Sequence, residues 1–435
     1  MKIVHIVPGF GGTFYCGNCL RDSALVASLR QAGHEAVILP LYLPLILNGR
    51  AIHDGPPVFY GAVSIYIKQM FPSLQRMPVW LHKLLNSDFL LRYAARKAGS
   101  TRAHGLEALT ESMLLGEEGL QRQDLAELVN YLKNHEKPDI VHFSNALLLG
   151  MAGMVRREVK VPVVCSLQDE DVWIDAMEKG AREKLWTLLA KQASSVDALI
   201  AVSDWFSMEM KQKMQLPEGK VKTVPIGIDV SQYHFTTHSI ENPTIGFLSR
   251  LCEENGLGVL VDAFIMLKKD PDKSKLKLRL CGGHTGDDDS FIRSQLKKLR
   301  MNRLAKYVEI LPDFSLPSLS DFFSGLTILS VPVLKGEAFG LYQLEAMASG
   351  IPVVQPALGA FPEIIEKSGG GIVYQPNDAK TLAENIARLL EEPDKIIRLG
   401  IAGRRGVEEH FDCGKVTDEL LAIYQSVKQN FSVKT

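Results

Sequence analysis

Short apolar runs rich in β-branched residues alternate with segments of helical periodicity along the whole chain, and this alternation restricts the fold most. The first run, Ile3 to Val7, leads into glycines and then into a predicted helix from Asn18 to Ala32. Such short runs are typical of strands buried on both faces of a parallel sheet. The pattern predicts an α/β fold in which helices cover both faces of parallel sheets.

The alternation forms two series, which a polar stretch over 231–242 separates. The predicted strands are 3–7, 34–39, 139–143, 161–167 and 198–202 in the first series, and 244–248, 276–280, 308–310, 327–330, 352–355 and 372–374 in the second. We therefore predict two doubly wound, Rossmann-like domains over 1–230 and 240–412. An amphipathic helix from about 416 to 430 follows a predicted break at Asp412-Cys-Gly414. Open parallel sheets bind ligands at the carboxyl ends of their strands, so a cleft between the two domains is the expected place for a site.

Composition places the chain among ordinary soluble proteins. It has 435 residues, of which 46% are hydrophobic and 23% are charged, and its formal net charge is −1. These values are not those of disordered or collagen-like chains. Six cysteines in a chain of this length are too few for a disulfide-stapled secreted scaffold and fit a reducing compartment. We expect a cytoplasmic protein, and we expect no nucleic acid among its partners.

One segment departs from this balanced charge. Residues 68–102 carry seven Lys and Arg side chains and a single acid, Asp88, so the segment has a net charge of +6. Four aromatic residues are interleaved with these bases. A basic, aromatic-rich stretch can bind the anionic inner face of a membrane or an anionic acceptor. Alternatively, the segment is a helical insert whose aromatic residues face the core and whose bases face water.

The stretch 336–354 contains the strongest candidate site. It follows a predicted strand, continues as a loop and becomes a helix near Leu341, with Gly340 at the junction. The free N–H groups of a first helical turn, together with the helix dipole, favour a bound phosphate. Glu337 precedes this helix, and Glu345 lies inside it. A carboxylate can accept hydrogen bonds from two vicinal sugar hydroxyls, so the two acids could bind opposite ends of a ligand whose phosphates lie at the helix N-terminus.

This stretch resembles the signature of the retaining glycosyltransferases of family 4. Glu337 and Glu345 are separated by seven residues, and the sequence Glu-Ala-Phe-Gly-Leu…Leu-Glu-Ala-Met-Ala-Ser-Gly-Ile-Pro-Val carries the likeness. Weaker matches extend over nearly the whole chain: Gly11-Gly12, Arg-Gln-Ala-Gly-His34, Pro-Asp-Ile-Val-His142, Pro-Ile-Gly-Ile-Asp229, Leu-Ser-Arg250, Cys281-Gly-Gly283 and Gly359 through Glu363. The resemblance implies the GT-B fold, in which two Rossmann-like domains face each other across a cleft. The second domain would hold most of the donor, and a C-terminal helix over 416–435 would return to the first.

The resemblance also implies roles for individual residues. Glu345 would bind the ribose diol of a nucleotide, and Glu337 would contact hydroxyls of the transferred sugar. Backbone amides of Phe339, Gly340 and Leu341 would bind the phosphate next to the sugar.

Further donor contacts are implied on other loops. Arg250 would neutralise the diphosphate, Gly283 follows a strand of the donor domain, and Gly12 would let a loop of the first domain close over the phosphates. The family's usual lysine, five residues after the arginine, is replaced here by Asn255. Losing a charge that pairs with phosphate costs about 1.5–3 kcal/mol, the range for hydrogen bonds to charged groups. GT-B enzymes as a class need no metal for transfer, so the resemblance implies neither a metal nor another cofactor.

Gln168 is a second departure from the family pattern. It follows the predicted strand 161–167 and precedes Asp169, where relatives commonly have His-Asp. A glutamine can hydrogen-bond a sugar hydroxyl but cannot take up a proton near neutral pH. The resemblance implies front-face attack, in which the leaving phosphate takes the proton of the acceptor, and this mechanism needs no general base.

Several other patterns look like chemical sites. Cys16-Gly-Asn-Cys19 has the spacing of redox and zinc motifs, but the sequence has no second pair of this spacing, and we favour packing in a substrate loop. The acidic triplets 169–171 and 287–289 are expected to be solvated loops rather than metal sites. The glycines from Gly9 to Gly12 do not have the dinucleotide-binding spacing, which argues against NAD.

These observations predict a glycosyltransferase that moves a sugar from a nucleotide-diphosphate sugar to a hydroxyl of a glycan, a lipid-linked acceptor or a small molecule, with retention of configuration. The alternative is a GT-B protein that binds a nucleotide sugar or a glycan without catalysis and is the partner of an active transferase. Asn255 and Gln168 motivate this alternative. Turnover distinguishes the two functions.

If residues 68–102 dock the protein on a membrane, its flotation with liposomes should depend on anionic lipid. We expect the protein to float with phosphatidylglycerol-containing vesicles and to sediment with neutral phosphatidylcholine vesicles, because each base near an anionic surface contributes about 1 kcal/mol. Equal flotation with both kinds of vesicle would remove the membrane interpretation.

Overall fold

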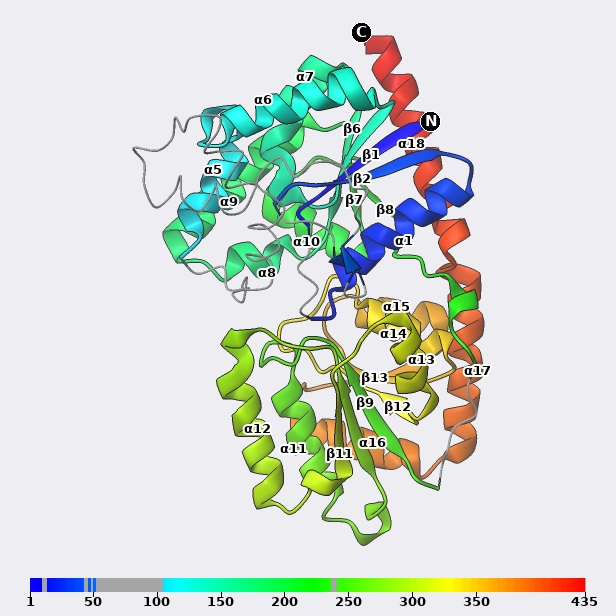
Figure 1. The fold of residues 1–435 in the computed structure, drawn as a ribbon. Coiled ribbons are helices and arrows are strands. Elements are labelled where there is room, and N and C mark those ends of the chain that lie inside the picture. The colour runs from blue at the N-terminus through cyan, green and yellow to red at the C-terminus, as the bar shows by residue number, and fades with distance from the viewer. Residues whose placement is uncertain (10–13, 43–45, 48–49, 52–104, 236–240, 435) are drawn as a thin grey trace. The chain divides into compact units, whose positions relative to one another are not determined.

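Two compact units make up the described part of the chain (Figure 1). The computed structural model describes residues 1–9, 14–42, 46–47, 50–51, 105–235 and 241–434. The basic segment 68–102 and the glycines Gly11 and Gly12 lie outside the described residues. The first unit comprises 1–12, 18–225 and 417–435, and the second comprises 13–17 and 226–416. Residues 13–17 thus belong to the second unit, although the chain on either side of them belongs to the first.

Six parallel strands form the sheet of the first unit, in the order β2-β1-β5-β6-β7-β8. Their bounds are β1 Lys2–Val7, β2 Glu35–Pro40, β5 Ile140–Phe143, β6 Val163–Leu167, β7 Ala198–Ala201 and β8 Val221–Thr223. The strands β5, β6 and β7 are buried along their whole length, as expected when helices cover both faces of a parallel sheet. The sequence predicted the other five strands of this sheet but missed β8, because only one of the three residues of β8 is apolar. A short antiparallel pair, β3 Ile46–Leu47 and β4 Arg50–Ala51, lies outside this sheet.

Helices connect the strands of the first unit. They are α1 Gly17–Gln31, α5 Glu107–Leu115, α6 Arg122–Tyr131, α7 Ala152–Val159, α8 Glu170–Asp175, α9 Lys179–Gln192 and α10 Asp204–Met214. Local sequence signals set several of their ends. At the start of α10, the hydroxyl of Ser203 accepts a hydrogen bond of 3.1 Å from the N–H of Phe206. Such a cap satisfies one of the N–H groups that a helix start leaves unpaired.

The C-terminal helix α18, Cys413–Lys434, packs into the first unit from Thr417 onward. The Tyr424 hydroxyl shares a hydrogen bond of 2.6 Å with Nδ1 of His142 in β5. Lys428 forms an ion pair of 2.6 Å with Asp139, just before the same strand. The last helix is therefore tied to the centre of the first sheet.

The predicted break before α18 is wrong in its position. The helix begins at Cys413 and includes Gly414, which the sequence placed in the break. A carboxylate oxygen of Asp412 accepts a hydrogen bond of 2.9 Å from the N–H of Gly414. This cap lets the helix start before the glycine, since the first N–H groups of a helix need such acceptors.

The second unit contains another sheet of six parallel strands, in the order β11-β10-β9-β12-β13-β14. Their bounds are β9 Thr244–Leu248, β10 Lys277–Cys281, β11 Val308–Leu311, β12 Ile328–Leu329, β13 Val353–Pro356 and β14 Gly371–Tyr374. All six were predicted from the sequence. The strand order reverses between β9 and β12, and ligands of open parallel sheets bind beyond the strand ends at such a point.

Seven α-helices accompany this sheet in the described part of the unit. They are α11 Leu257–Leu267, α12 Asp289–Met301, α13 Leu316–Ser324, α14 Leu341–Ala348, α15 Phe361–Ser368, α16 Ala379–Leu390 and α17 Pro393–His410. Figure 1 shows α11 and α12 on one side of the strands and α13 and α14 on the other. Helix α11 packs against α16, and both α14 and α15 pack against α17.

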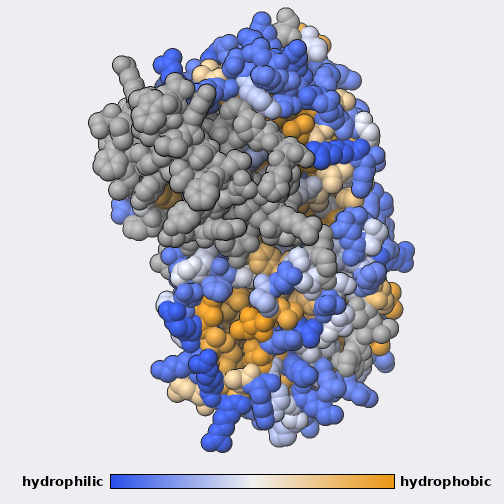
Figure 2. Space-filling view, in the orientation of Figure 1, coloured by the Kyte–Doolittle hydropathy of each residue, from blue (hydrophilic) through white to orange (hydrophobic). Residues whose placement is uncertain are grey.

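One area of the second unit is hydrophobic at its surface. Figure 2 shows hydrophobic residues gathered over the region that α11 occupies in the same view of Figure 1. The sequence of α11, LGVLVDAFIML, is apolar on nearly all sides, and its Met266 is 40% exposed. Within the described residues, no helix is both long enough and apolar enough to span a membrane.

Glycines bring α17 close to the neighbouring helices α14 and α15. A Cβ atom added at Gly403 would lie 3.1 Å from Cγ of Met347 in α14. One added at Gly406 would lie 2.3 Å from the carbonyl oxygen of Ser368 in α15, a distance that leaves no room for a methyl group. The packing of α17 on both helices therefore depends on these two positions.

We expect Gly406→Ala to lower the free energy of unfolding by about 1–3 kcal/mol, the range for overpacked sites. The matched control is Gly180→Ala in α9, where an added Cβ meets no atom within 4 Å. Because alanine forms helices better than glycine, this control should change stability by no more than about 1 kcal/mol. Urea unfolding measures both variants. Equal stability of the two would contradict the close approach of α17 and α15.

Candidate functional site

The loop between β12 and α14 forms the centre of the candidate site in the second unit. Gly340 precedes the helix with φ of +82°, in the left-handed region that favours glycine. A Cβ atom at this position would also lie 2.9 Å from Cε1 of Phe361. All eight residues of α14 are buried. The helix start that was predicted to bind phosphate is therefore built into the core of the unit on a backbone that favours glycine.

Glu345 is a buried carboxylate that accepts hydrogen bonds from two tyrosines. It is 1% exposed, and its Oε2 accepts a bond of 2.6 Å from the hydroxyl of Tyr15. Its Oε1 accepts a bond of 2.8 Å from the hydroxyl of Tyr233. Burial raises the pKa of Glu345 to about 7, although the two hydrogen bonds act in the opposite direction. The acid is thus held by two neutral hydroxyl donors rather than by a cation.

Glu337 lies on the loop before α14 and is half-buried. Its Oε2 accepts a hydrogen bond from the hydroxyl of Tyr342 in the helix. Its backbone carbonyl accepts a bond of 3.0 Å from the N–H of Ala360. Gly359 packs so closely that a Cβ there would lie 2.4 Å from the backbone nitrogen and oxygen of Glu337. The loop before α15, which the sequence had singled out, fixes the backbone that carries this acid.

Arg250 follows β9 and forms an ion pair with Asp288. Its Nε and a terminal nitrogen donate to the two oxygens of Asp288 at 3.0 and 2.9 Å. Burial opposes the charge of Asp288, but the hydrogen bonds from Arg250 and Thr285 hold its pKa below the usual value. The Arg250 side chain is 16% exposed, so this pair is not an ordinary surface salt bridge.

Asn255, at the place of the family's lysine, holds the loop that follows β9. Its amide nitrogen donates to the hydroxyl of Ser249 at 2.7 Å and to the carbonyl oxygen of Arg250 at 3.1 Å. The residue therefore fixes the backbone around Arg250 through neutral hydrogen bonds.

Residues 14–17 run along the loops of the second unit. Phe14 forms an isolated antiparallel bridge with Gly283, which follows β10. The N–H of Tyr15 donates a hydrogen bond of 2.7 Å to the carbonyl of Gly282. Both glycines have positive φ, and a Cβ on Gly282 would lie 2.2 Å from a backbone oxygen of Ser249. The two glycines thus form the turn against which the segment pairs.

Two further residues of this segment lie near other predicted donor residues. The ring centre of Phe14 lies 5.8 Å from the guanidinium carbon of Arg250. A Cβ added at Gly17 would lie 3.6 Å from Cβ of Leu341 at the start of α14. The segment therefore contacts three of the eight residues predicted to bind the donor, which are Arg250, Gly283 and Glu345. Its Gly17 lies near a fourth, Leu341.

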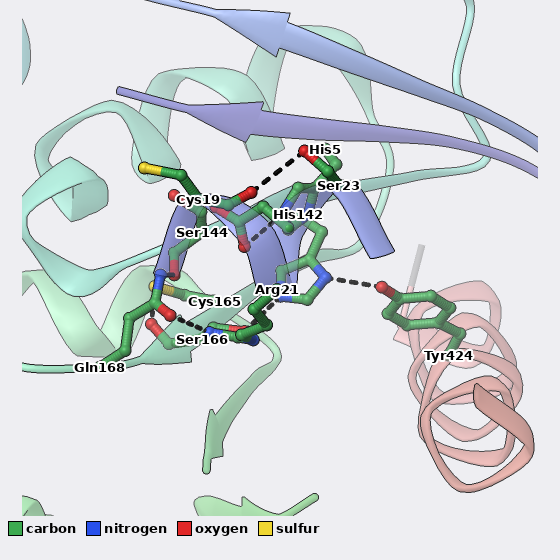
Figure 3. Close-up of polar contacts among 11 residues, drawn as sticks. His5, Cys19, Arg21, Ser23, His142, Ser144, Cys165, Ser166, Gln168 and Tyr424 are labelled. Atoms are coloured by element: carbon green, nitrogen blue, oxygen red, sulfur yellow. Dashed lines mark hydrogen bonds and ion pairs between the residues drawn. The ribbon is translucent and has the colours of Figure 1, made fainter. Parts of the chain in front are cut away.

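Gln168 belongs to the first unit, where it is tied into a buried network (Figure 3). Its side-chain oxygen accepts a hydrogen bond from Arg21, and its side-chain nitrogen donates to the carbonyl of Ser144 at 2.7 Å. Arg21 also donates to the hydroxyl of Ser166. Gln168 is 5% exposed, so both ends of its amide serve the interior of this unit.

His142 and Tyr424 form the other end of this network (Figure 3). Nε2 of His142 lies 2.9 Å from the hydroxyl of Ser166, which links the histidine to Arg21. Burial lowers the pKa of His142 well below its usual value, and the neighbouring charges of His5 and Arg21 add to this effect. The ring therefore stays neutral and joins β5 to α18 by hydrogen bonds.

The expectation that the two acidic triplets are solvated is wrong for the middle residue of each. Glu170 is 1% exposed and accepts hydrogen bonds of 2.6 and 2.7 Å from the N–H groups of Ala146 and Gln168. Burial raises its pKa to about 8. Asp288, in the second triplet, is 5% exposed and pairs with Arg250. Buried acids need such partners, which the run of charges in the sequence does not reveal.

The described residues include no group of three or more His, Cys, Asp and Glu side chains that could hold a metal ion. All six cysteines are free, and Cys16 and Cys19 are partly exposed. The redox and zinc spacing of these two residues is thus not accompanied by a disulfide.

A pocket of about 610 Å³ lies elsewhere in the first unit, between α8, α9 and α10. Asp175 lies at this pocket and accepts hydrogen bonds from the indole N–H of Trp186, at 2.8 Å, and from Lys213, at 2.5 Å. None of the residues that the sequence predicted for catalysis or donor binding lines it.

Family models match both halves of the chain. Residues 109–232 match "Glycosyltransferase Family 4", and residues 242–392 match "Glycosyl transferases group 1". The second match includes Glu337, Glu345 and Arg250.

Two relatives are similar to the protein over much of the chain. One is the alpha-maltose-1-phosphate synthase of Mycolicibacterium smegmatis, 25% identical over 402 residues, which cover 86% of this chain and 97% of the relative. The other is D-inositol 3-phosphate glycosyltransferase 1 of Catenulispora acidiphila, 27% identical over 66% of this chain and 72% of the relative.

Solved structures share the fold over nearly the whole length. Sucrose-phosphate synthase from Thermosynechococcus elongatus has a TM-score of 0.70 at 16% identity and covers 98% of this chain and 99% of its own. Anabaena Alr3699/HepE in complex with UDP-glucose has a TM-score of 0.68 at 14% identity and covers 98% and 100%. The predicted GT-B fold, with its two Rossmann-like domains, is confirmed.

Sequence reasoning missed the two tyrosines that bind Glu345. Tyr233 lies in the polar stretch 231–242, which was predicted to be a connection. Tyr15 lies in a loop in which the sequence analysis considered the glycines and not the tyrosine. Their hydroxyl groups meet the acid through tertiary packing, and neither has a local sequence signal.

The charge of Glu345 should make stability depend on pH. Its pKa is about 7 in the folded protein and 4.5 without burial, so folding favours the protonated form. Stability should then fall as the pH rises from about 4.5 to 7, by on the order of 3 kcal/mol. Gln at this position resembles the protonated acid. We therefore expect Glu345→Gln to be more stable than the wild type at pH 8, with a much smaller difference at pH 5.

Urea unfolding of the wild type and of Glu345→Gln at pH 5 and pH 8 measures the difference in stability between them. The other titrating groups are the same in both proteins, so their contributions cancel in this difference. A difference that does not change with pH would contradict the buried, easily protonated acid.

Proposed function

The chain belongs to the family 4-like glycosyltransferases, and we propose from this that it moves a sugar from a nucleotide-diphosphate sugar to a hydroxyl acceptor with retention of configuration. The observation that carries the proposal is the environment of Glu345. Each of its two oxygens accepts a hydrogen bond from a neutral hydroxyl, at 2.6 and 2.8 Å. A ribose diol presents two hydroxyl donors of the same kind, and a carboxylate can accept both. In this proposal Glu345 binds the ribose.

The phosphates would bind at the start of α14. The first N–H groups of a helix lack intrahelical acceptors, and the dipole adds partial positive charge at this end. Arg250, on the loop after the neighbouring strand β9, would supply a full positive charge. A departing diphosphate is stabilised by donors and charges of this type. The complexes of Anabaena HepE with UDP and UDP-glucose support a nucleotide sugar as donor.

Glu337 would orient the transferred sugar. It is half-buried on the loop before α14, and Tyr342 fixes one of its oxygens. A carboxylate can accept several hydrogen bonds, including one from a sugar hydroxyl. A glutamine cannot take up a proton near neutral pH, so in this proposal the proton of the acceptor passes to the leaving phosphate.

A panel of nucleoside diphosphates and their sugars, in a thermal-shift assay and in assays of transfer and donor hydrolysis, tests the proposal. We expect one nucleotide class to stabilise the protein and its sugar conjugate to be turned over. Binding of a nucleotide sugar without any turnover would favour the non-catalytic binding protein instead.

We expect the two acids to differ in the step that they support. Glu345→Ala should weaken nucleoside diphosphate binding roughly 10- to 100-fold, the loss of hydrogen bonds to a charged group. Glu337→Ala should lower kcat roughly 10- to 100-fold and leave nucleoside diphosphate affinity nearly unchanged, because this acid would contact only the sugar. Calorimetry with the nucleotide and steady-state kinetics separate the two effects.

Glu384→Ala, an exposed acid on α16, is the control and should change neither quantity. If both site variants retain wild-type affinity and rate, the assignment of these acids is rejected.

A further inference from the structure

Glu345 is inaccessible to a ligand as long as Tyr15 covers it. The acid is 1% exposed and Tyr15 is 5% exposed, and the hydroxyl of Tyr15 lies 2.6 Å from Oε2. A ribose hydroxyl cannot come within hydrogen-bond distance of a carboxylate that has almost no accessible surface. At least one group that covers the acid must therefore move before a diol can bind.

The two tyrosines on Glu345 are attached to the protein in different ways. Tyr233 packs edge-on against Phe323, with 6.4 Å between the ring centres, and its carbonyl accepts a hydrogen bond of 2.8 Å from Arg404. Tyr15 lies in the short stretch 13–17, which enters the second unit and leaves it again within five residues. Its backbone is held through the Gly282 carbonyl at 2.7 Å. Displacing Tyr15 therefore moves a short stretch rather than the body of the unit.

The residues that this stretch touches are the second reason to single it out. Besides Glu345, the stretch contacts Arg250 and Gly283 and comes near Leu341, and the family resemblance implies all three as donor residues. One peptide segment thus reaches the acid, the cation and the helix start that a nucleoside diphosphate would need. The segment therefore overlaps the predicted donor site at several residues and not only through the hydrogen bond to Glu345.

We propose that Tyr15 sets the nucleotide affinity of the site: its hydroxyl occupies the hydrogen-bonding position of a ribose hydroxyl on Glu345, and a nucleoside diphosphate binds by displacing residues 14–17. This inference rests on the proposed function, since it takes Glu345 to be the ribose ligand. Tyr15 is a competing group within the chain and takes no part in the chemistry. The apparent affinity for the nucleotide is lower than the intrinsic one by the fraction of molecules in which Tyr15 has left.

Tyr15→Phe tests the proposal because it removes the competing hydroxyl and keeps the ring. The loss of one hydrogen bond to a charged group predicts that the variant binds its nucleoside diphosphate about 10- to 150-fold more tightly than the wild type. The probes are UDP, GDP and ADP, measured by calorimetry at the same pH and salt. Unchanged or weaker binding by the variant would overturn the proposal.

Tyr233→Phe is the matched control, since it also removes one hydroxyl from Glu345. Because Tyr233 stays in place when the ligand binds, its hydroxyl acts equally on the free and the bound protein, and affinity should change less than about 3-fold. If both variants gained the same affinity, removing either hydroxyl from Glu345 would have the same effect. That result would overturn a special role for Tyr15. Thermal melts of both variants establish that each is folded.

Hydrogen exchange gives an independent readout in the wild-type protein. The N–H of Tyr15 donates to Gly282, so displacement of the segment should increase deuterium uptake in the peptide over 14–19 when a binding nucleotide is added. Decreased or unchanged uptake would mean that the segment stays over the ligand, which contradicts displacement.

The same measurements separate this inference from the proposed function. If neither the wild type nor Tyr15→Phe binds any of the three nucleotides, the proposed donor is wrong, and the inference fails with it. If a nucleotide binds, Glu345→Gln weakens the binding and Tyr15→Phe leaves it unchanged, the proposed function stands and only the role of Tyr15 is rejected.

Discussion

The site in the second unit depends on keeping one carboxylate inside the protein. A buried acid without partners is costly, and Glu345 avoids this cost through two hydroxyl donors and through partial protonation near neutral pH. The packing of the helices around Glu345 makes this burial possible. Helix α14 is buried over its whole length, and the glycines of α17 allow that helix to pack behind it. A carboxylate that accepts hydrogen bonds from neutral hydroxyls can exchange one of them for a sugar hydroxyl at little electrostatic cost.

The positive charge available for a diphosphate is smaller than the family pattern predicts. Arg250 shares its charge with Asp288, and the neutral Asn255 stands where a second cation was expected. Two of the five N–H donors of the guanidinium face the aspartate. If the proposed donor binds here, the N–H groups at the start of α14 would contribute a larger share of the phosphate binding. This chain would hold its donor more by hydrogen bonds than by net charge.

Local sequence patterns predicted most strands and helices, but they did not predict which distant residues contact one another. The six strands of the second sheet follow from short apolar runs, whereas β8, with the sequence Val-Lys-Thr, has no such run. The position of Glu345 beside a helix start could be predicted because both belong to one continuous motif. Its two tyrosines could not, since they are 330 and 112 residues away in the sequence. The burial of Glu170 was missed for the same reason, because its partners include the backbone N–H of Ala146 on another loop.

Gln168 illustrates how a changed residue can be explained by its surroundings. The side chain joins Arg21 of α1 to the carbonyl of Ser144 after β5, and its own N–H binds the buried Glu170. A histidine at this position would have to share the interior with the charge of Arg21, which already helps to lower the pKa of His142. A neutral amide provides one acceptor and one donor at the same place and adds no charge. The glutamine thus matches the buried arginine of this chain, although an amide cannot take up a proton near neutral pH.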